Sequence, residues 1–165
     1  MNQPLSQLPD SALEASLKAA MPSGELCLDE HSRSLYAQDV YTRKHAAAMV
    51  LRPGNTEELA SALRLLHEAQ ITAIPHGGGM SYTGGLLPQD GATAVIDFGL
   101  MNHILEINPE DMTVTVECGC TWSELHEALS KHELRTPFWG TLSGIRATVG
   151  GGMSQNGIFW GSGQY

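Results

Sequence analysis

The stretch that decides the fold of this chain is IPHGGGMSYTGG, residues 74–85. Three successive glycines follow a short apolar run and precede two hydroxyl side chains, Ser81 and Thr83. Ordering a glycine costs about 0.5–1 kcal/mol more than ordering an alanine, so an ordered glycine run needs a compensating interaction. Because glycine accepts positive φ, its consecutive N–H groups can converge on a phosphate or diphosphate. A flexible hairpin tip is the alternative that this stretch alone leaves open.

A second loop repeats the same chemistry further along the chain. Residues 140–157 read GTLSGIRATVGGGMSQNG, with another triple glycine and several hydroxyl side chains. Two such loops in one small chain are hard to explain as unrelated turns. They predict two backbone concavities that hold one diphosphate from both sides.

Two better-known phosphate motifs fit the first loop poorly. A P-loop requires Gly-Lys-Ser/Thr after its glycines, and no lysine stands near. A dinucleotide fingerprint starting at Gly77 and Gly79 would require a third glycine at Tyr82. Asp97, about twenty residues on, does stand where such a fold carries its ribose-binding acid. A Rossmann-type NAD-binding protein therefore remains an alternative.

The sequence around these loops predicts alternating strands and helices. Apolar runs and period-two alternation predict strands at residues 49–51, 71–74, 93–98, 103–107 and 112–118. Capping signals predict helices that begin at Ser11, at Asn55 or Thr56, and at Thr121, the last with a capping box. The strand, helix and strand before the first loop predict a parallel pair. Residues 24–43 and 137–165 show no clear period and are expected to be irregular.

The composition excludes several classes of partner. A formal net charge of -9 argues against nucleic acid, which requires a basic stripe, and against an anionic membrane surface. No apolar run is long enough to span a membrane and the start lacks a signal-peptide pattern, so a cytoplasmic protein is expected. Cys27, Cys118 and Cys120 form no disulfide framework, and the histidines show no metal-ligand spacing, so we expect reduced thiols and no metal.

The ordered set of motifs resembles a known family, the FAD-binding domain of vanillyl-alcohol oxidase and p-cresol methylhydroxylase (PCMH) type flavoproteins. The matching stretches, from residue 45 to 165, are LRP (51–53), IPHGGG (74–79), MNHILEI (101–107), VECG (116–119) and TVGG (148–151). Each motif alone is weak, whereas their order and spacing are specific. Within the family the chain is most similar to the D-lactate dehydrogenase and glycolate oxidase large-subunit branch.

The resemblance implies an α+β fold, a PCMH-type FAD-binding domain. It would consist of a small βαβ subdomain followed by a mixed or antiparallel sheet with flanking helices. Residues 1–44 would form an N-terminal helix and a lead-in segment, and residues 45–165 the FAD-binding domain. The family's domain continues past Tyr165 and a substrate domain normally follows, so we expect an incomplete domain and a truncated chain or fragment.

The resemblance also implies the site. FAD is the expected cofactor, and residues of both loops would wrap its pyrophosphate and flavin or ribityl parts. These residues are His76, Gly77, Gly78, Gly79, Met80, Ser81, Gly84, Thr141, Leu142, Ser143, Gly144, Ala147, Thr148, Gly150, Gly151, Gly152, Asn156 and Gly157. The family often has arginine where His76 stands and a proline near Thr141. Some members attach flavin through a histidine at the position of Met80, so a thioether there implies non-covalent FAD.

The implied activity is that of a flavin-dependent oxidoreductase. FAD would accept a hydride from a 2-hydroxy acid such as D-lactate or glycolate and pass electrons to an acceptor protein or a quinone. The catalytic residues are unknown, because in the family they come largely from the part beyond Tyr165. A non-catalytic FAD-binding module or fragment is the alternative from another functional class.

Overall fold

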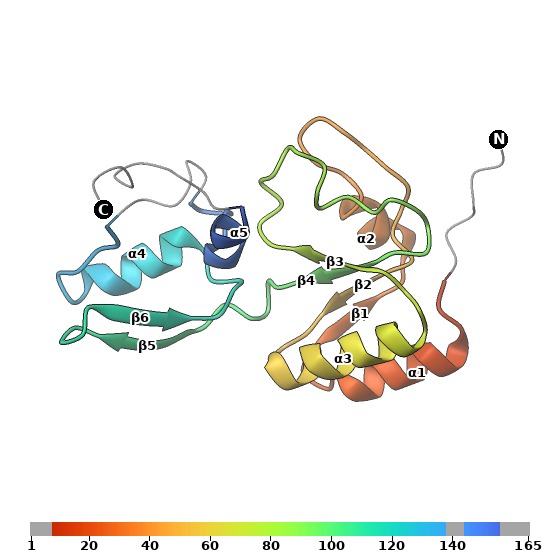
Figure 1. The fold of residues 1–165 in the computed structure, drawn as a ribbon, viewed down its shortest axis with the longest axis horizontal. Helices are drawn as coiled ribbons and strands as arrows, with labels where there is room; N and C mark the ends of the chain where they lie inside the picture. Colours follow the sequence, from red (N-terminus) through yellow and green to blue (C-terminus); the bar gives the residue numbers. More distant parts are fainter. Residues whose placement is uncertain (1–7, 138–143, 156–165) are drawn as a thin grey trace. The chain divides into compact units, whose positions relative to one another are not determined.

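The computed structural model describes residues 8–137 and 144–155 and divides into two compact units (Figure 1). The first unit contains Met1–His76 and Ser81–Leu100, and the second contains Gly77–Met80 and Met101–Tyr165. The first glycine loop is therefore divided, since its glycine run belongs to the second unit.

The first unit is built on a four-stranded mixed sheet with the order β1-β2-β4-β3. Its strands are β1 (Glu25–Cys27), β2 (Met49–Arg52), β3 (Ala73–His76) and β4 (Ala94–Asp97). Strand β4 pairs in parallel with both β2 and β3, and β1 pairs antiparallel with β2. The two central strands, β2 and β4, are almost entirely buried, as expected for a sheet covered on both faces.

Helices cover both faces of this sheet because successive strand residues point to opposite sides. Helices α1 (Ser11–Ala20) and α3 (Thr56–Glu68) lie side by side on one face, where Leu17 and Leu66 meet Met49 and Leu51 of β2 (Figure 1). Helix α2 (Glu30–Leu35) contacts β2, and a smaller cluster that includes Val50 and Val95 forms on the opposite face.

The second unit packs two helices on a hairpin. Strands β5 (Ile104–Asn108) and β6 (Thr113–Val116) pair antiparallel, and they are followed by α4 (Trp122–Ser130) and α5 (Val149–Ser154). The hairpin's inward side chains pack against a buried cluster that consists of Cys120, Trp122, Leu125, Leu129 and Ala147. No helix among the described residues is long and apolar enough to cross a membrane.

Several sequence predictions are confirmed. The class is α+β, Asn55 caps α3, and residues on either side of the turn at 109–112 form the predicted hairpin. Thr121 and Glu124 form the predicted capping box: the Glu124 N–H donates to the Thr121 hydroxyl, and the Glu124 carboxylate accepts from the Thr121 N–H.

Other predictions were wrong, each for a local reason. The first helix is capped by Asp10, whose carboxylate accepts from the Leu13 N–H at 2.8 Å, and Ser11 already lies inside the helix. Residues 24–43 contain β1 and α2, which are too short to show a period in the sequence. The same holds for α5 within the C-terminal segment.

The predicted direct pairing of the two strands around α3 was also wrong. Strands β2 and β3 are both parallel to β4, which lies between them. β4 follows later in the chain, and local sequence carries no signal for an insertion of that kind. Met112, predicted to start a strand, instead has φ 54° and belongs to the hairpin turn.

Candidate functional site

Parts of the two glycine loops touch each other inside the second unit. A Cβ atom on Gly78 would lie 1.7 Å from the carbonyl oxygen of Arg146, and a Cβ on Gly77 would lie 2.7 Å from the Thr148 hydroxyl. No side chain fits at Gly78, where glycine is required for the close approach of the two backbones, whereas a side chain at Gly77 would displace the Thr148 hydroxyl. The sequence separates these segments by about seventy residues, and the fold brings them together.

Four consecutive backbone donors in the first loop have no acceptor in the part of the chain that the structure describes. Within residues 8–137 and 144–155, nothing accepts a hydrogen bond from the N–H groups of Gly77, Gly78, Gly79 or Met80. We call this segment, Gly77–Met80, the amide run. Gly79 has φ 69°, in the left-handed region that favours glycine. Consecutive backbone N–H groups around such a glycine can converge on an anion, so this half-buried run of donors is a candidate site for an anionic ligand.

The second triple glycine uses its N–H groups differently. The Gly150 N–H donates to the Cys118 carbonyl at 3.0 Å, and the Gly151 N–H donates to the Thr148 hydroxyl at 3.1 Å. A Cβ on Gly150 would lie 2.6 Å from the Cβ of Cys118. These glycines therefore let α5 pack tightly on the segment before α4, and all three of their N–H groups are already engaged.

The remaining predicted site residues fall in three places. With the amide run, the second unit holds Gly144, Ala147, Thr148, Gly150, Gly151 and Gly152. The first unit holds His76, Ser81 and Gly84. Thr141, Leu142, Ser143, Asn156 and Gly157 lie outside the described residues. Met80 turns its side chain to the apolar cluster of the second unit.

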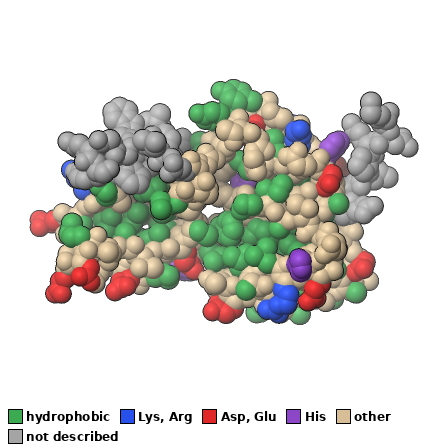
Figure 2. All heavy atoms as spheres, in the orientation of Figure 1, with side chains coloured by type: hydrophobic (Ala, Val, Ile, Leu, Met, Phe, Trp, Pro, Cys, Tyr) green, Lys and Arg blue, Asp and Glu red, His purple; other side chains and the backbone are tan. Residues whose placement is uncertain are grey.

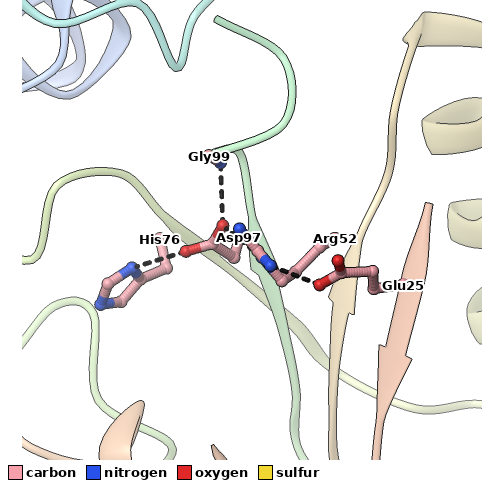
Figure 3. Close-up of polar contacts among 5 residues, drawn as sticks. All are labelled: Glu25, Arg52, His76, Asp97 and Gly99. Atoms are coloured by element: carbon pink, nitrogen blue, oxygen red, sulfur yellow. Dashed lines mark hydrogen bonds and ion pairs between the residues drawn. The ribbon is translucent and has the colours of Figure 1, made fainter. Parts of the chain in front are cut away.

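A row of charged residues crosses the sheet of the first unit and ends at His76. Figure 3 shows Glu25, Arg52, Asp97 and His76, which we call the charged row, one residue from each strand. Arg52 pairs with Glu25, and its Nε lies 3.3 Å from Asp97 Oδ1. His76 Nδ1 lies 3.6 Å from Asp97 Oδ2, which is too long for a hydrogen bond, so the two side chains face each other without one.

The surroundings of Asp97 favour its ionised form. Burial raises the pKa of this carboxyl group, but its neighbours outweigh burial and hold the pKa below its usual range. These neighbours are His76, the Gly99 N–H, Tyr36 and Arg52. Conversely, burial and the Asp97 charge raise the pKa of Tyr36 to about 12. The sequence indicated Asp97 only as a counterpart of the ribose-binding acid of a Rossmann fold. It gave no signal for a role of Arg52, because the pairing of Arg52 with Asp97 depends on strand order.

The negative charge of the chain is displayed on its surface. Figure 2 shows acidic side chains along the β5–β6 hairpin, where Glu106, Glu110 and Asp111 are exposed. An anionic ligand at the amide run would therefore be held by backbone donors rather than by an excess of basic side chains.

Comparison with known proteins places this geometry in a family. The FAD binding domain family matches residues 47–165. The chain belongs to this family. The resemblance derived from the motifs, and FAD as the cofactor, are thereby confirmed. FAD contains a diphosphate, and the free donors of the amide run beside the second loop fit that group.

Relatives of this FAD binding domain include a D-lactate dehydrogenase and a glycolate oxidase subunit. The chain is 36% identical over 109 residues to the mitochondrial D-lactate dehydrogenase [cytochrome] of Kluyveromyces lactis, covering 65% of this chain and 19% of that protein. It is 32% identical over 107 residues to the glycolate oxidase subunit GlcD of Bacillus subtilis, covering 65% of this chain and 22% of that protein. The chain thus spans about a fifth of the length of these relatives.

Solved structures confirm the fold of the domain. An alkyldihydroxyacetonephosphate synthase matches with a TM-score of 0.78 and 24% identity, covering 91% of this chain and 30% of that one. A p-cresol methylhydroxylase matches with a TM-score of 0.65 and 18% identity, covering 77% of this chain and 27% of that one. The predicted PCMH-type fold is therefore confirmed.

Proposed function

We propose that this chain is the FAD-binding part of an oxidoreductase that oxidises a 2-hydroxy acid such as D-lactate or glycolate. The observation that carries the proposal is the amide run, held against residues 146–148 of the second loop. The similarity to a D-lactate dehydrogenase and a glycolate oxidase subunit supports the substrate class. An electron acceptor, either a protein or a quinone, and a cytoplasmic location are further parts of the proposal.

The residues of the chain would act by binding and placement. The N–H groups of the amide run would donate to the FAD diphosphate, and residues 144–152, which contact this run, would lie beside the bound group. The backbone around Gly77 and Gly78 is already in close contact with Arg146 and Thr148, so little ordering entropy remains to be lost on binding. When bound, FAD supplies the hydride-accepting chemistry.

We also propose that FAD binds without a covalent bond to the first loop. The Met80 side chain packs against the apolar cluster of the second unit, and a thioether forms no bond to flavin. Treatment with acid and separation of the precipitate should release all the flavin into solution. Flavin retained on the denatured chain would contradict this part of the proposal.

The binding site is tested by Gly78→Ala, with Gly85→Ala as the matched control. The added methyl group at Gly78 collides with the Arg146 carbonyl, whereas a Cβ at Gly85 has only the Thr83 hydroxyl nearby, at 3.8 Å. FAD affinity is measured from the change in flavin fluorescence on titration. We expect at least a tenfold loss of affinity for Gly78→Ala and little change for Gly85→Ala. Unchanged affinity in a folded Gly78→Ala chain would exclude the amide run as the site.

The activity is tested by adding D-lactate or glycolate to the FAD-loaded chain without oxygen. Bleaching of the flavin absorbance would support the oxidoreductase proposal. Bound flavin that no 2-hydroxy acid reduces would instead support the alternative of a non-catalytic FAD-binding module.

A further inference from the structure

The charged row is ordered by the register of the sheet. Glu25 pairs with Arg52 across β1 and β2, and Asp97 pairs with His76 across β4 and β3. Leu51 pairs with Ile96, which places the next residues of those strands, Arg52 and Asp97, at the same level. Each of the four strands therefore contributes one charged or titratable residue to a single line across the sheet.

Asp97 lies between Arg52 and His76 in the charged row, so its carboxylate can contact both side chains. Its Oδ1 atom is engaged by Arg52 Nε at 3.3 Å and by the Gly99 N–H at 2.8 Å. Its Oδ2 atom faces His76 Nδ1, as Figure 3 shows. Both residues are more than nine-tenths buried, so the polar atoms of each side chain need partners inside the protein.

The His76 ring is enclosed on its other side. The Tyr36 ring meets it edge-on, with the ring centroids 4.8 Å apart. The charged and titratable groups that face this part of the sheet are Glu25 and Cys27 on β1, Arg52 on β2, Asp97 on β4, and Tyr36 after α2. Among these, the carboxylate of Asp97 is the group that lies against the imidazole, with Oδ2 3.6 Å from Nδ1.

His76 is joined by a peptide bond to the first glycine of the amide run. Its carbonyl oxygen also accepts a hydrogen bond from the Phe98 N–H at 3.2 Å. Glycine accepts a wide range of backbone conformations, so the run has no strong direction of its own. The contact of Gly78 with Arg146 holds its middle, and His76 holds the point where it starts.

We propose that Asp97 is a positioning residue for FAD binding, which holds His76 and thereby the start of the amide run through the charged row. This inference rests on the proposed function, since it assumes that the amide run binds the FAD diphosphate. Asp97 itself contacts no cofactor in this scheme. Its effect passes entirely through His76.

The test is a double-mutant cycle on FAD affinity in the full chain. The variants are Asp97→Asn, His76→Gln and the pair combined, with Glu68→Gln as a control that removes one exposed negative charge from α3. We expect each single variant at the row to weaken FAD binding about tenfold, a size typical of coupling between contacting residues. The control should stay within about twofold of wild type, a change that falls inside the error of additivity.

The decisive result is the combined variant. If Asp97 acts through His76, adding Asp97→Asn to His76→Gln should weaken binding by no more than about a further twofold, because the effects of coupled residues do not add. Asp97→Glu, which keeps the charge, should restore most of the affinity that Asp97→Asn loses. A stability role alone would lower the melting temperature without changing FAD affinity.

Three outcomes would overturn the proposal. They are wild-type affinity in Asp97→Asn, independent effects that multiply in the combined variant, and failure of Asp97→Glu to rescue a folded chain. If Asp97→Asn does not fold, Asp97→Glu and His76→Gln still test the proposal. Unchanged FAD affinity in His76→Gln would show that Asp97 does not act on binding through the His76 ring. Gly78→Ala distinguishes failure of this proposal from failure of the proposed function. Unchanged FAD affinity in that variant would exclude the amide run as the binding site, independently of the results for Asp97 and His76.

Discussion

At the scale of single residues, Gly150 is a packing residue of the second unit. It lies at the start of α5, and a Cβ there would meet the Cys118 Cβ at 2.6 Å and the Cys118 carbonyl at 2.7 Å. We predict that Gly150→Ala lowers the free energy of unfolding by about 1–3 kcal/mol, as overpacking typically does. Urea unfolding measures this, with Gly85→Ala as the control. A wild-type midpoint for Gly150→Ala would show that α5 moves away without cost.

The cysteines provide a second prediction at this scale. Burial raises the pKa of all three thiols, and burial together with Glu124 raises that of Cys120 to about 11. Since the thiolate is the reactive form, we expect all three to react with a disulfide reagent at pH 8 more slowly than a free thiol, and Cys120 to be the slowest. The chain unfolded in urea serves as the reference. Fast reaction of Cys120 in the folded chain would contradict the prediction.

At the scale of elements, Glu58 ties the start of α3 to the segment before β1. Its carboxylate accepts hydrogen bonds from the Ser23 N–H at 2.8 Å, the Ser23 hydroxyl at 2.6 Å and the Gly54 N–H at 2.9 Å. Glu58 is buried, although a charged residue in the first turn of a helix is more often exposed. The Glu58 side chain thus links two parts of the chain that are more than thirty residues apart in sequence.

We predict that Glu58→Gln destabilises the first unit by about 1.5–3 kcal/mol, the usual contribution of hydrogen bonds to a charged group. Glu57→Gln is the control, because Glu57 is exposed in the same turn and its loss changes the charge equally. The readout is the difference between the two variants in urea unfolding. Equal stability of the two variants would mean that the contacts of Glu58 contribute no more than its charge.

At the scale of the whole molecule, buried carboxylates make stability depend on pH. Burial raises the pKa of Asp97 and of Glu58, but their hydrogen-bonding and charged neighbours outweigh burial and lower both pKa values. The folded chain therefore binds fewer protons than the unfolded chain near pH 4, so this contribution is present above the unfolded pKa values and lost as the pH falls through the folded ones.

We expect the melting temperature to fall steeply as the pH is lowered from about 5 to about 3, below the unfolded carboxyl pKa values near 4. The variant that combines Asp97→Asn with Glu58→Gln should start lower and show a flatter dependence. Thermal unfolding followed by circular dichroism across this range measures both effects. A wild-type slope in the combined variant would assign the acid sensitivity to other carboxylates.

FAD should stabilise the domain by mass action. Binding to the folded state alone contributes about 2.7 kcal/mol when the free FAD concentration is a hundred times Kd. Hydrogen exchange locates the effect, since the amides of Gly77–Met80 have no acceptor within the described part of the chain. We predict that FAD slows their exchange more than that of Gly150 or Gly151, whose N–H groups already have protein acceptors. Equal protection at both places would contradict the amide run as the main donor set.

The sequence by itself determined the features that depend on near neighbours. The glycine runs, the Thr121 capping box and the alternation across β5 and β6 each depend on a few adjacent residues. Backbone freedom, helix capping and strand period are local properties, so the sequence shows them directly. The ordered motifs also sufficed for the family, the fold class and FAD. The short elements β1, α2 and α5 were not predicted, because the segments that contain them show no clear period in the sequence.

Only the tertiary structure decided which distant groups meet. The charged row needs β4 between β2 and β3, and the contact of Gly78 with Arg146 needs two loops folded together. The structure also separated the free amides of Gly77–Met80 from the engaged ones of Gly150 and Gly151, which look equivalent in sequence. The physical reason is that hydrogen-bond partners and packing are non-local, so a repeated glycine motif does not reveal which acceptors the rest of the chain supplies.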